Sequence, residues 1–486
     1  MKMTNFTQLK NKMFDKSEEL VISTFREPYT SISENGEIKI KKNSGGVVTA
    51  LDSLLKKTGG VWYAFSRLTP NSENEGKSEK TPVNSDEGNY LLNRVLIDRN
   101  FDENYQNISN RGIWPLFHQV FIRPIFSDAN WIEYKKANEL MAKNIAELGD
   151  SNKLIWIHDY QLMLVSKYLQ SFNNNSVTGF FWHIPWPSAS TFRIFPYANE
   201  ALEGLLANSV IGFQTQYDAS NFMNSVDSVL EARIDRAQSE VYFQGKKTKV
   251  VSIPVSIDPT EIQIQSEKYK ANLASLLKKI GIKNVKFGIG VDRLDYTKGL
   301  KEKMLGILDF FDKNPQFVGK FTFIQIASPT RVHLNEYKRT AEELEEVVED
   351  INWKYATLNW KPIVLIDEFI DYSDILTLYS GADICIVSSL DDGMNLVCKE
   401  FVASTKNGVL ILSKFAGASL ELVNSISINP YSVSEISNSI LLALNMPEEE
   451  RIKRIVQMKS EINDHSVFDW AEKFLTVLKN EQKRQI

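Results

Sequence analysis

The feature that most constrains the fold is an alternation of short apolar runs with stretches of helical periodicity, and it occurs in two blocks. The apolar run Phe287–Val291, for example, is followed by Leu300–Phe311, where apolar residues recur at helical spacing. This alternation predicts a mostly parallel, doubly wound sheet in each block. The expected strands are Leu20–Thr24, Val61–Phe65, Tyr90–Ile97, Leu154–Ile157, Val177–Trp182, Ser209–Gln214 and Lys249–Ile253, then Phe287–Val291, Phe321–Ala327, Ile363–Glu368, Asp383–Val387 and Val409–Ser413.

Two blocks of similar size in 486 residues predict an α/β protein with two Rossmann-like domains facing across a cleft. Pro254 and Pro259 bracket a short polar stretch that suits the crossing between domains. We therefore expect an N-terminal domain over 1–254 and a C-terminal domain over 255–465. A final helix over 466–486 carries Trp470 and Phe474 and is expected to pack back on the N-terminal domain. The polar stretch Pro70–Gly88 is expected to be a surface loop.

The composition excludes several classes of protein. A net charge of −5 argues against a broad nucleic-acid surface. Cys385 and Cys398 form neither a disulfide framework nor a cluster of metal ligands. No run approaches the ~18 apolar residues of a membrane span, and the first residues lack the apolar core of a secretion signal. We expect a cytoplasmic protein that binds no metal, cofactor, nucleic acid or membrane.

The stretch VDRLDYTKGL, from Val291 to Leu300, places two cations between a strand and a helix. Parallel sheets bind ligands outside the carboxyl ends of their strands. Arg293 offers a fork of donors and Lys298 a compact charge, which together suit a diphosphate. An ordinary loop with two solvated basic residues is the alternative, because most exposed charges have no specific partner.

A second anion-site candidate follows the strand Asp383–Val387. Gly393 permits a tight turn, and the next residues are expected to open a helix whose first N–H groups lack intrahelical acceptors. A carboxylate in the first turns of that helix suits the hydroxyls of a ribose, and one in the preceding turn suits a sugar. The residues concerned are Asp392, Gly393, Met394, Asn395, Leu396 and Glu400.

In the first block, two successive strands each end in a polar side chain, Asp159 and His183. A lone histidine after a strand is more often structural, but two polar strand ends side by side indicate a site. The glycine pair Gly45-Gly46 precedes a helical pattern and would let the backbone approach a ligand, although such pairs are usually only turns.

Long, ordered motifs resemble those of one enzyme family: NSGGVVTAL, SNRGIWPLFH, WIHDYQL, FFWHIPWPS, FRIFP, VDRLDYTKGL, SPTR, DDGMNLVCKEF and SKFAGAS. They are similar to those of the retaining glycosyltransferases of family 20, of the GT-B fold, which make trehalose 6-phosphate. The similarity runs from about Val21 to Trp470. It implies transfer of glucose from a nucleoside-diphosphate glucose, UDP-glucose or GDP-glucose, to glucose 6-phosphate.

The resemblance also implies residue roles. Positioning and leaving-group stabilisation would fall to His183, Arg293, Lys298 and Asp159. The donor would be bound by Gly45, Gly46, Arg293, Lys298, Asp392, Gly393, Met394, Asn395, Leu396 and Glu400. The acceptor would be bound by Arg26, Trp62, Tyr105, Trp114, Asp159 and Arg331. The family's usual account is attack by the acceptor hydroxyl on the face that the diphosphate leaves.

Two positions depart from the family pattern. The family writes the first turn as S-N-R-x-P, whereas here Ser23-Thr24-Phe25-Arg26-Glu27-Pro28 carries the arginine one place later. The family has Arg-Asp-Gly before Met-Asn-Leu, and here Asp391 replaces that arginine. The first departure bears on the acceptor phosphate and the second on the charge beside the donor.

Three alternative functions remain at this point. A glucosylglycerol-phosphate synthase would use glycerol 3-phosphate, and the FREPYT turn resembles that group. A pseudo-glycosyltransferase that couples cyclitols is compatible with HDYQL and HIPWPS. A sugar-phosphate sensor would bind without turnover, although a sensor needs no cations for a leaving group. The donor base, the acceptor and the oligomeric state, with a homo-oligomer as one option, are left open by the sequence.

Overall fold

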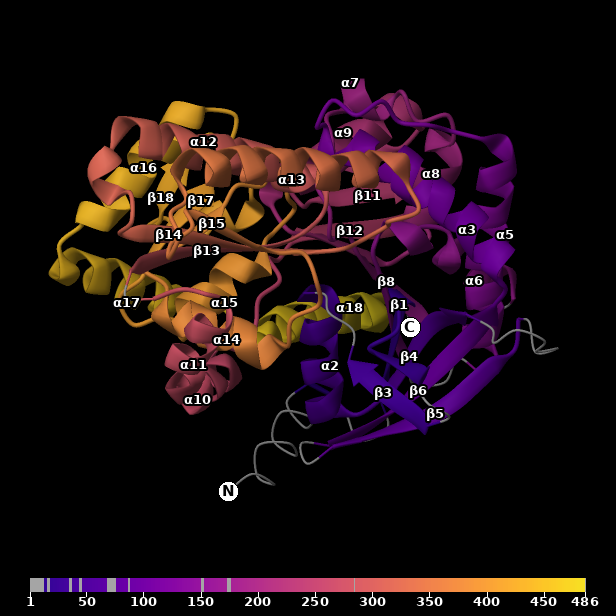
Figure 1. The fold of residues 1–486 in the computed structure, drawn as a ribbon. Helices are drawn as coiled ribbons and strands as arrows, with labels where there is room; N and C mark the ends of the chain where they lie inside the picture. Colours follow the sequence, from indigo (N-terminus) through magenta and orange to yellow (C-terminus); the bar gives the residue numbers. More distant parts are fainter. Residues whose placement is uncertain are drawn as a thin grey trace. The chain divides into compact units, whose positions relative to one another are not determined.

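The computed structural model describes residues 13–14, 18–34, 37–42, 46–67, 76–85, 88–149, 153–172, 176–283 and 285–485 (Figure 1). The chain divides into two compact units. Unit 1 comprises Met1–Val255 and Val467–Ile486, and unit 2 comprises Ser256–Ser466. The boundaries expected from the sequence, after 254 and 465, each lie one residue from these.

Unit 2 contains a six-stranded parallel sheet in the order β15-β14-β13-β16-β17-β18. The first strand is central, and later strands are added on one side and then on the other, so the prediction of a doubly wound sheet is confirmed here. The carboxyl ends of β13 and β16 therefore lie side by side at the point where the winding reverses, which is where such sheets bind ligands. The strands are β13 (Lys286–Arg293), β14 (Phe321–Ser328), β15 (Ile363–Ile366), β16 (Ile384–Val387), β17 (Val409–Ser413) and β18 (Ile426–Ile428).

Helices cover both faces of this sheet (Figure 1). One side holds α12 (Leu300–Lys313), α13 (Asn335–Tyr355) and α16 (Val433–Asn445), and the other holds α10 (Pro259–Tyr269), α11 (Leu273–Lys279), α14 (Tyr372–Gly381), α15 (Leu396–Ser404) and α17 (Glu448–Asp464). Strand side chains alternate between the faces, so Ile384 and Ile386 both enter the core beneath α12, with Met304, Phe310 and Ile436.

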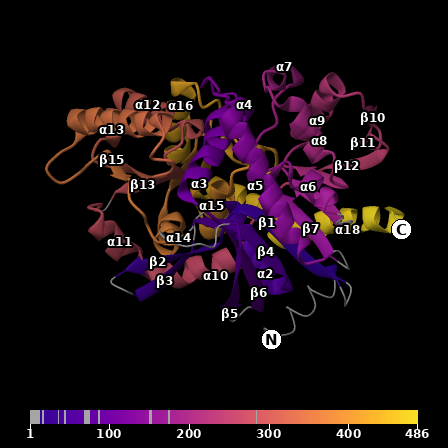
Figure 2. The same ribbon diagram turned by 90° about the vertical axis from the view of Figure 1, so that its right-hand side faces the viewer.

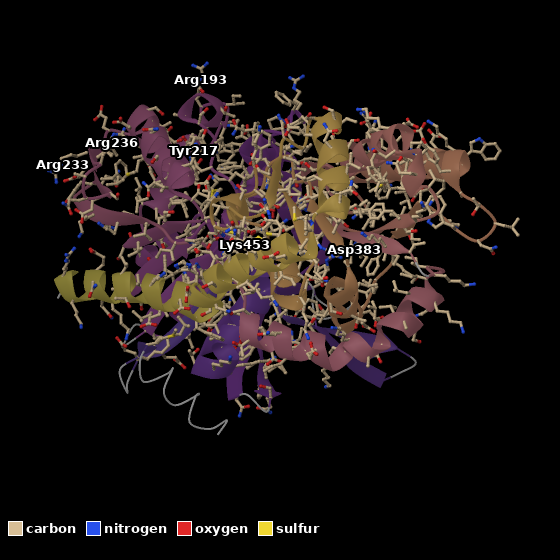
Figure 3. All side chains as sticks on the ribbon, turned by 90° about the vertical axis from the view of Figure 1, so that its left-hand side faces the viewer. Arg193, Tyr217, Arg233, Arg236, Asp383 and Lys453 are labelled. Carbon is tan, nitrogen blue, oxygen red and sulfur yellow. The ribbon has the colours of Figure 1, made fainter. Side chains whose placement is uncertain are left out.

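The start of β16 is tied to the neighbouring strand and to α17 by Asp383, which Figure 3 labels. Its Oδ2 accepts the N–H of Phe287 at 3.0 Å, and its Oδ1 lies 3.7 Å from Nη1 of Arg451. These contacts fix the register of β16 against β13.

Unit 1 contains a ten-stranded sheet in the order β10-β11-β12-β9-β8-β7-β1-β4-β6-β5. The strands from β12 to β6 in this order run parallel, and β10, β11 and β5 are added antiparallel at the two edges. The winding reverses between β1 and β7. The strands are β1 (Glu19–Arg26), β4 (Val61–Arg67), β5 (Ser78–Ser85), β6 (Gly88–Ile97), β7 (Lys153–His158), β8 (Val177–Phe181), β9 (Val210–Phe213), β10 (Arg233–Asp235), β11 (Glu240–Phe243) and β12 (Lys246–Ser252).

The helices α3, α5, α6 and α8 follow one another along unit 1 (Figure 2), and α2 packs against the C-terminal helix α18. No helix among the described residues is both long and apolar enough to cross a membrane. The helices are α2 (Gly46–Thr58), α3 (Arg99–Asn107), the π-helical turn η1 (Ile108–Ile113), α4 (Trp114–His118), α5 (Asp128–Ala146), α6 (Val165–Ser171), α7 (Ala189–Phe192), α8 (Ala198–Leu205), α9 (Gln216–Val229) and α18 (Val467–Gln485).

The prediction of a loop over Pro70–Gly88 is wrong for its second half. Residues Ser78–Ser85 form β5, which pairs antiparallel with β6 at the edge of the sheet. An edge strand tolerates polar side chains and a proline, here Pro82, because one side of it needs no ladder bonds. The sequence SEKTPVNS thus lacks the apolar alternation that identifies a buried strand. β2 (Tyr29–Glu34) and β3 (Glu37–Lys42) form a separate hairpin, which the sequence analysis did not predict although Ile38 and Ile40 alternate with charged residues in β3.

The C-terminal helix α18 packs on the sheet of unit 1 through two buried aromatic residues, Trp470 and Phe474. The ring of Phe474 stacks on Trp156 with 4.6 Å between centroids and 9° between planes. It fits there because two neighbouring strands carry glycine. A Cβ at Gly179 would lie 2.7 Å from Cε1 of Phe474, and one at Gly212 would lie 2.9 Å from its Cε2.

We expect Gly179→Ala to destabilise unit 1 by about 1–3 kcal/mol, because the added methyl group overlaps the Phe474 ring in a packed core. Urea unfolding of Gly179→Ala, Phe474→Leu and the double variant measures the coupling between the two sites. The double variant should lose less stability than the sum of the single losses. Additive losses would show that the ring does not fill the space above Gly179.

Candidate active site

Two turns of unit 2 that lie far apart in the sequence form one structure. β13 ends at Arg293 and is followed by the turn that carries Lys298; β16 is followed by the turn that carries Asp392. The ammonium of Lys298 donates to Oδ2 of Asp392 at 2.6 Å. The hydroxyl of Ser388 donates to the Lys298 carbonyl at 3.0 Å, and Leu390 N–H donates to the Thr297 carbonyl at 2.7 Å. The two stretches predicted to bind a diphosphate are thus parts of a single site.

The close approach of these turns requires glycine at Gly299. Its φ is +59°, in the left-handed region, and a Cβ there would lie 2.3 Å from the carbonyl oxygen of Ser388. Any side chain would push the two turns apart.

Asp392 is fixed by three donors and in turn fixes the start of α15. Besides Lys298, Ser389 Oγ at 3.0 Å and Asn395 Nδ2 at 3.2 Å donate to its Oδ2. The side-chain oxygen of Asn395, Oδ1, accepts Cys398 N–H at 3.1 Å and caps α15. The helix therefore begins at Leu396, and the expectation that Met394 opens it is wrong, because the asparagine cap sets the boundary. Met394 and Gly393 lie buried in the preceding turn.

Asp295 is a buried carboxylate between the cations, and the sequence analysis did not single it out. Its Oδ2 lies 3.6 Å from Nη1 of Arg331 and 3.9 Å from Nη2 of Arg293. Its Oδ1 accepts the N–H and the hydroxyl of Thr297, at 3.1 and 3.0 Å. Burial alone would raise the pKa of Asp295, but the charges of Arg331, Arg293 and Lys298 outweigh burial and hold the pKa below its ordinary value. A carboxylate flanked by two cations in VDRLDYTKGL was the available signal.

Arg331 is held from a second side as well. Its guanidinium donates to the hydroxyl of Tyr337, and its side chain is only 5% exposed. Its φ of +49° is uncommon for a residue with a side chain. A left-handed arginine with a buried side chain is a sign of a constrained, functional position rather than a free surface charge.

Glu400 lies in the second turn of α15, and Tyr372 donates to its Oε1 at 3.1 Å. Burial raises the pKa of Glu400 to about 7.

Asp391, which replaces the family arginine, lies close enough to Tyr431 for its charge to affect the pKa of that tyrosine. Burial raises the pKa of that tyrosine, and the charges of Glu302 and Asp391 add to the effect.

In unit 1 the structure brings Asp159 and His183 together, as the two strand ends indicated. The Oδ1 atom of Asp159 accepts Tyr160 N–H at 3.0 Å and His183 N–H at 3.3 Å. Asp159 also donates its own N–H to the Phe181 carbonyl at 2.8 Å. Its φ is +74°, a conformation that a residue with a side chain adopts at a cost of about 1–3 kcal/mol.

Both ring nitrogens of His183 are bonded within unit 1. Its Nε2 lies 3.0 Å from Nδ1 of His158, and its Nδ1 lies 3.2 Å from Nε2 of Gln214. Burial lowers the pKa of His183 to about 3, and burial together with the neighbouring His183 lowers the pKa of His158. His183 is therefore a neutral ring held in place, and it transfers no proton while these bonds persist.

The displaced arginine of the first turn is accommodated by a β-bulge. Along β1, Thr24 pairs with Ala64 of β4, and the next pair is Arg26 with Phe65. Phe25 is the extra residue, and its ring contacts Tyr105 at 5.3 Å between centroids. The bulge absorbs the inserted residue, so Arg26 follows Thr24 in register and lies exposed at the end of β1.

The predicted acceptor aromatics differ in exposure. Trp62 is fully buried and donates its indole N–H to Thr24 Oγ1 at 2.7 Å. Tyr105 is also fully buried and donates to the Gln161 carbonyl at 2.5 Å. Trp114, which follows the π-helical turn and stacks on His118 at 4.0 Å, is 6% exposed. Neither Trp62 nor Tyr105 offers a ring face to a ligand in this structure. Gly46 begins α2, and Gly45 lies outside the described residues.

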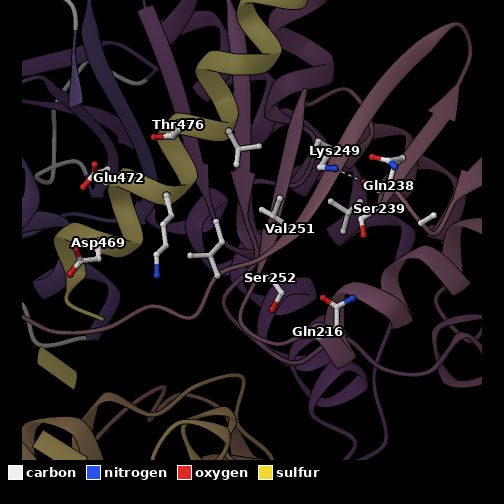
Figure 4. Close-up of a pocket in the computed structure, with 14 residues that line it drawn as sticks. Gln216, Gln238, Ser239, Lys249, Val251, Ser252, Asp469, Glu472 and Thr476 are labelled. Atoms are coloured by element: carbon white, nitrogen blue, oxygen red, sulfur yellow. Dashed lines mark hydrogen bonds between the residues drawn. The ribbon is translucent and has the colours of Figure 1, made fainter. Parts of the chain in front are cut away.

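Two other features of the described residues are separate from these groups. A cavity of about 790 Å³ in unit 1 lies between β12 and α18 and includes Lys249, Ser252 and Glu472 (Figure 4), but no predicted site residue lines it. In unit 2, Glu421, Glu461 and His465 could together face a metal ion. The ammonium of Lys399 lies 2.7 Å from Glu421 and already neutralises that carboxylate.

We expect Asp295→Asn to destabilise unit 2 by about 3–5 kcal/mol, because it removes the buried carboxylate charge that faces the guanidinium groups of Arg331 and Arg293 at 3.6 and 3.9 Å. The wild-type advantage requires the ionised carboxylate, whose pKa is below the ordinary 3.8. The difference in unfolding free energy should thus be constant at neutral pH and shrink only as the pH falls below 3.8. Denaturant unfolding of both proteins across this range tests it, and a difference that persists unchanged in acid would contradict it.

Comparison with known proteins agrees with this geometry. Residues 17–480 match the sequence model of glycosyltransferase family 20. An alpha,alpha-trehalose-phosphate synthase [UDP-forming] of Aspergillus niger is 34% identical, over 97% of this chain and 91% of its own. A trehalose-6-phosphate synthase of E. coli solved with UDP-2-fluoro glucose is 31% identical with a TM-score of 0.83, over 95% and 99% of the two chains. A synthase from Burkholderia xenovorans solved with glucose-6-phosphate is 27% identical with a TM-score of 0.86, over 95% and 100%. The chain belongs to glycosyltransferase family 20.

Proposed function

We propose that this protein transfers glucose from UDP-glucose to glucose 6-phosphate, with retention of configuration, and so makes trehalose 6-phosphate. The observation that carries the proposal is the joining of Arg293, Lys298 and the capped start of α15 at the point where the sheet of unit 2 reverses its winding. This arrangement suits the diphosphate of a nucleotide sugar, and the relatives from Aspergillus niger and Burkholderia xenovorans are named as UDP-forming synthases.

Donor binding is assigned to unit 2 and to the start of α2. Arg293 and Lys298 bind the diphosphate, and the first N–H groups of α15 add partial positive charge. Asp392 accepts hydroxyls of the glucose, and Glu400 accepts those of the ribose. Gly393, Met394, Asn395 and Leu396 contribute backbone to this site, and the family resemblance assigns Gly45 and Gly46 to donor binding as well.

Acceptor binding is assigned to Asp159, Trp114, Arg26 and Arg331. The bulge at Phe25 supports glucose 6-phosphate over glycerol 3-phosphate, because it returns Arg26 to the place in register that follows Thr24. The insertion therefore does not remove the arginine from this edge of the sheet. Trp62 and Tyr105 act from beneath the site, where their buried rings support Thr24 and Phe25.

Catalysis in this proposal is electrostatic and positional. The acceptor hydroxyl attacks the anomeric carbon on the face from which the diphosphate leaves, and a diphosphate oxygen accepts the hydroxyl proton. Arg293, Lys298 and the start of α15 stabilise the charge that grows on the leaving group. Asp159 orients the acceptor, and the neutral His183 holds the geometry without transferring a proton. We further propose that the protein is cytoplasmic, that it forms a homo-oligomer and that it accepts GDP-glucose as well as UDP-glucose.

The function is tested by incubating the protein with UDP-, GDP- or ADP-glucose and either glucose 6-phosphate or glycerol 3-phosphate, with products identified by mass. We expect trehalose 6-phosphate from UDP-glucose and glucose 6-phosphate. Product from glycerol 3-phosphate alone would support the glucosylglycerol-phosphate synthase instead. Nucleotide-sugar binding without any product would support the sensor.

Loss of either leaving-group cation should impair turnover severely. We expect Arg293→Ala and Lys298→Ala to lower kcat/KM by about 30-fold to several thousand-fold, the scale of removing one partner of a buried charged contact. Lys301→Ala is the matched control, because Lys301 lies at the start of α12, three residues after Lys298, is 47% exposed and forms an ion pair only with Glu343 among the described residues, at 3.3 Å. Turnover near wild type in the first two variants would refute their assignment.

Donor affinity should depend on pH through Glu400. Its carboxylate accepts ribose hydroxyls, so protonation below its pKa of about 7 removes an acceptor. The KM for UDP-glucose should therefore rise by about tenfold as the pH falls below that value. Glu400→Gln should show a raised donor KM without this pH dependence. A wild-type donor KM that is flat from acid to neutral pH would exclude the role.

A further inference from the structure

The ring of His183 is oriented by an amide that has only one satisfactory orientation. Gln214, the residue after β9, accepts the backbone N–H of Val255 with its Oε1 at 2.9 Å. Its NH₂ group therefore faces Nδ1 of His183, 3.2 Å away. Flipping the amide would place that NH₂ group against the Val255 N–H, two donors facing each other with no acceptor.

This orientation determines where the proton of His183 lies. Because the Gln214 NH₂ group can only donate, Nδ1 of His183 must be the unprotonated, accepting nitrogen. The ring proton is then on Nε2, which donates to Nδ1 of His158 at 3.0 Å. The last proton of the chain lies on Nε2 of His158, which is buried and has no partner among the described residues. The reverse direction of donation would place a His183 N–H against the Gln214 NH₂ group.

The chain of bonds has a particular end point. Val255 is the residue at which the polypeptide leaves unit 1, since Ser256 begins unit 2. The other end reaches the proposed acceptor site, because the backbone N–H of His183 donates to Asp159. The four residues Val255, Gln214, His183 and Asp159 thus connect the exit of the chain from unit 1 to a carboxylate that is proposed to orient the acceptor.

We propose that Gln214 is a positioning residue that fixes His183 as the Nε2-protonated ring and links the Asp159 carboxylate to the backbone at the end of unit 1. The proposal rests on the function proposed above for Asp159 and His183. A displacement of the Val255 backbone breaks the hydrogen bond from its N–H to Oε1 of Gln214. The Gln214 amide can then rotate, and the His183 ring loses the donor that orients it. Gln214 itself is buried, and its proposed effect on the acceptor is exerted through His183.

The matched variant is Gln214→Glu. The carboxylate keeps the shape of the side chain and still accepts the Val255 N–H, but it presents an acceptor to His183 in place of a donor. The His183 proton should then move to Nδ1. Gln216→Glu is the control, because it makes the same change at an exposed position two residues away.

The protonation state of His183 is read from ¹⁵N–¹H spectra of protein labelled at its histidines. The chain has only five histidines, so few signals need to be assigned. We expect the Nε2-protonated form of His183 in the wild type and in Gln216→Glu, and an Nδ1-protonated ring in Gln214→Glu. A wild-type ring protonated on Nδ1 would overturn the inference, and this measurement needs no variant to fold.

Kinetics distinguish positioning from packing. Gln214→Glu should lower kcat by about tenfold and raise the KM for glucose 6-phosphate, while the donor KM stays within about twofold, because neither His183 nor Val255, to which Gln214 is bonded, is assigned to donor binding. A moved proton with unchanged kcat and acceptor KM would overturn the positioning role. A wild type that uses no nucleotide sugar would contradict the proposed function, and the spectrum would still decide the protonation of His183.

Discussion

The interaction on which the candidate site depends is the sharing of two carboxylates, Asp295 and Asp392, among three cations. Asp295 is buried against Arg293 and Arg331, and Asp392 receives Lys298. Each carboxylate keeps the positive groups in fixed positions before any ligand is present. Fixed charges need no reorganisation when negative charge develops on a leaving group, and this makes them effective in a water-poor site. The contact between Lys298 and Asp392 also joins the turns after β13 and β16. One interaction therefore both fixes a charge and stabilises the fold of unit 2.

Unit 1 uses a different kind of restraint. Its proposed site residues lie at the ends of β1, β7 and β8 and are held mainly by neutral hydrogen bonds and packed rings. Asp159 accepts two backbone N–H groups in a strained conformation, and His183 is a neutral ring bonded at both nitrogens. In the proposed reaction, the cations of unit 2 would stabilise charge on the departing diphosphate, and the restrained groups of unit 1 would orient the attacking hydroxyl.

The parts that the sequence predicted well are those that carry a strong local signal. Buried parallel strands such as β13 and β17 are continuous apolar runs. The cations Arg293 and Lys298 and the turn at Gly393 predict the candidate anion site. Edge strands such as β5 have polar side chains and give no such signal. Such a strand forms because it pairs with the adjacent strand of the sheet, here β6, and not because of an apolar pattern in its own sequence. The role of Asp295, the bulge at Phe25 and the bond between Gln214 and His183 depend on contacts between distant segments, which a single sequence does not record.

The docking of Phe474 in the notch formed by Gly179 and Gly212 has a consequence for how the chain is made. Unit 2 is inserted within unit 1, so helix α18 of unit 1 is synthesised only after the whole of unit 2. All of unit 2 has emerged by then and can fold as a unit, while the first sheet still lacks its covering helix and leaves Trp156 uncovered. Nascent chains stalled before α18 should accordingly expose an apolar surface that binds chaperones, and completion of the earlier half awaits the synthesis of α18.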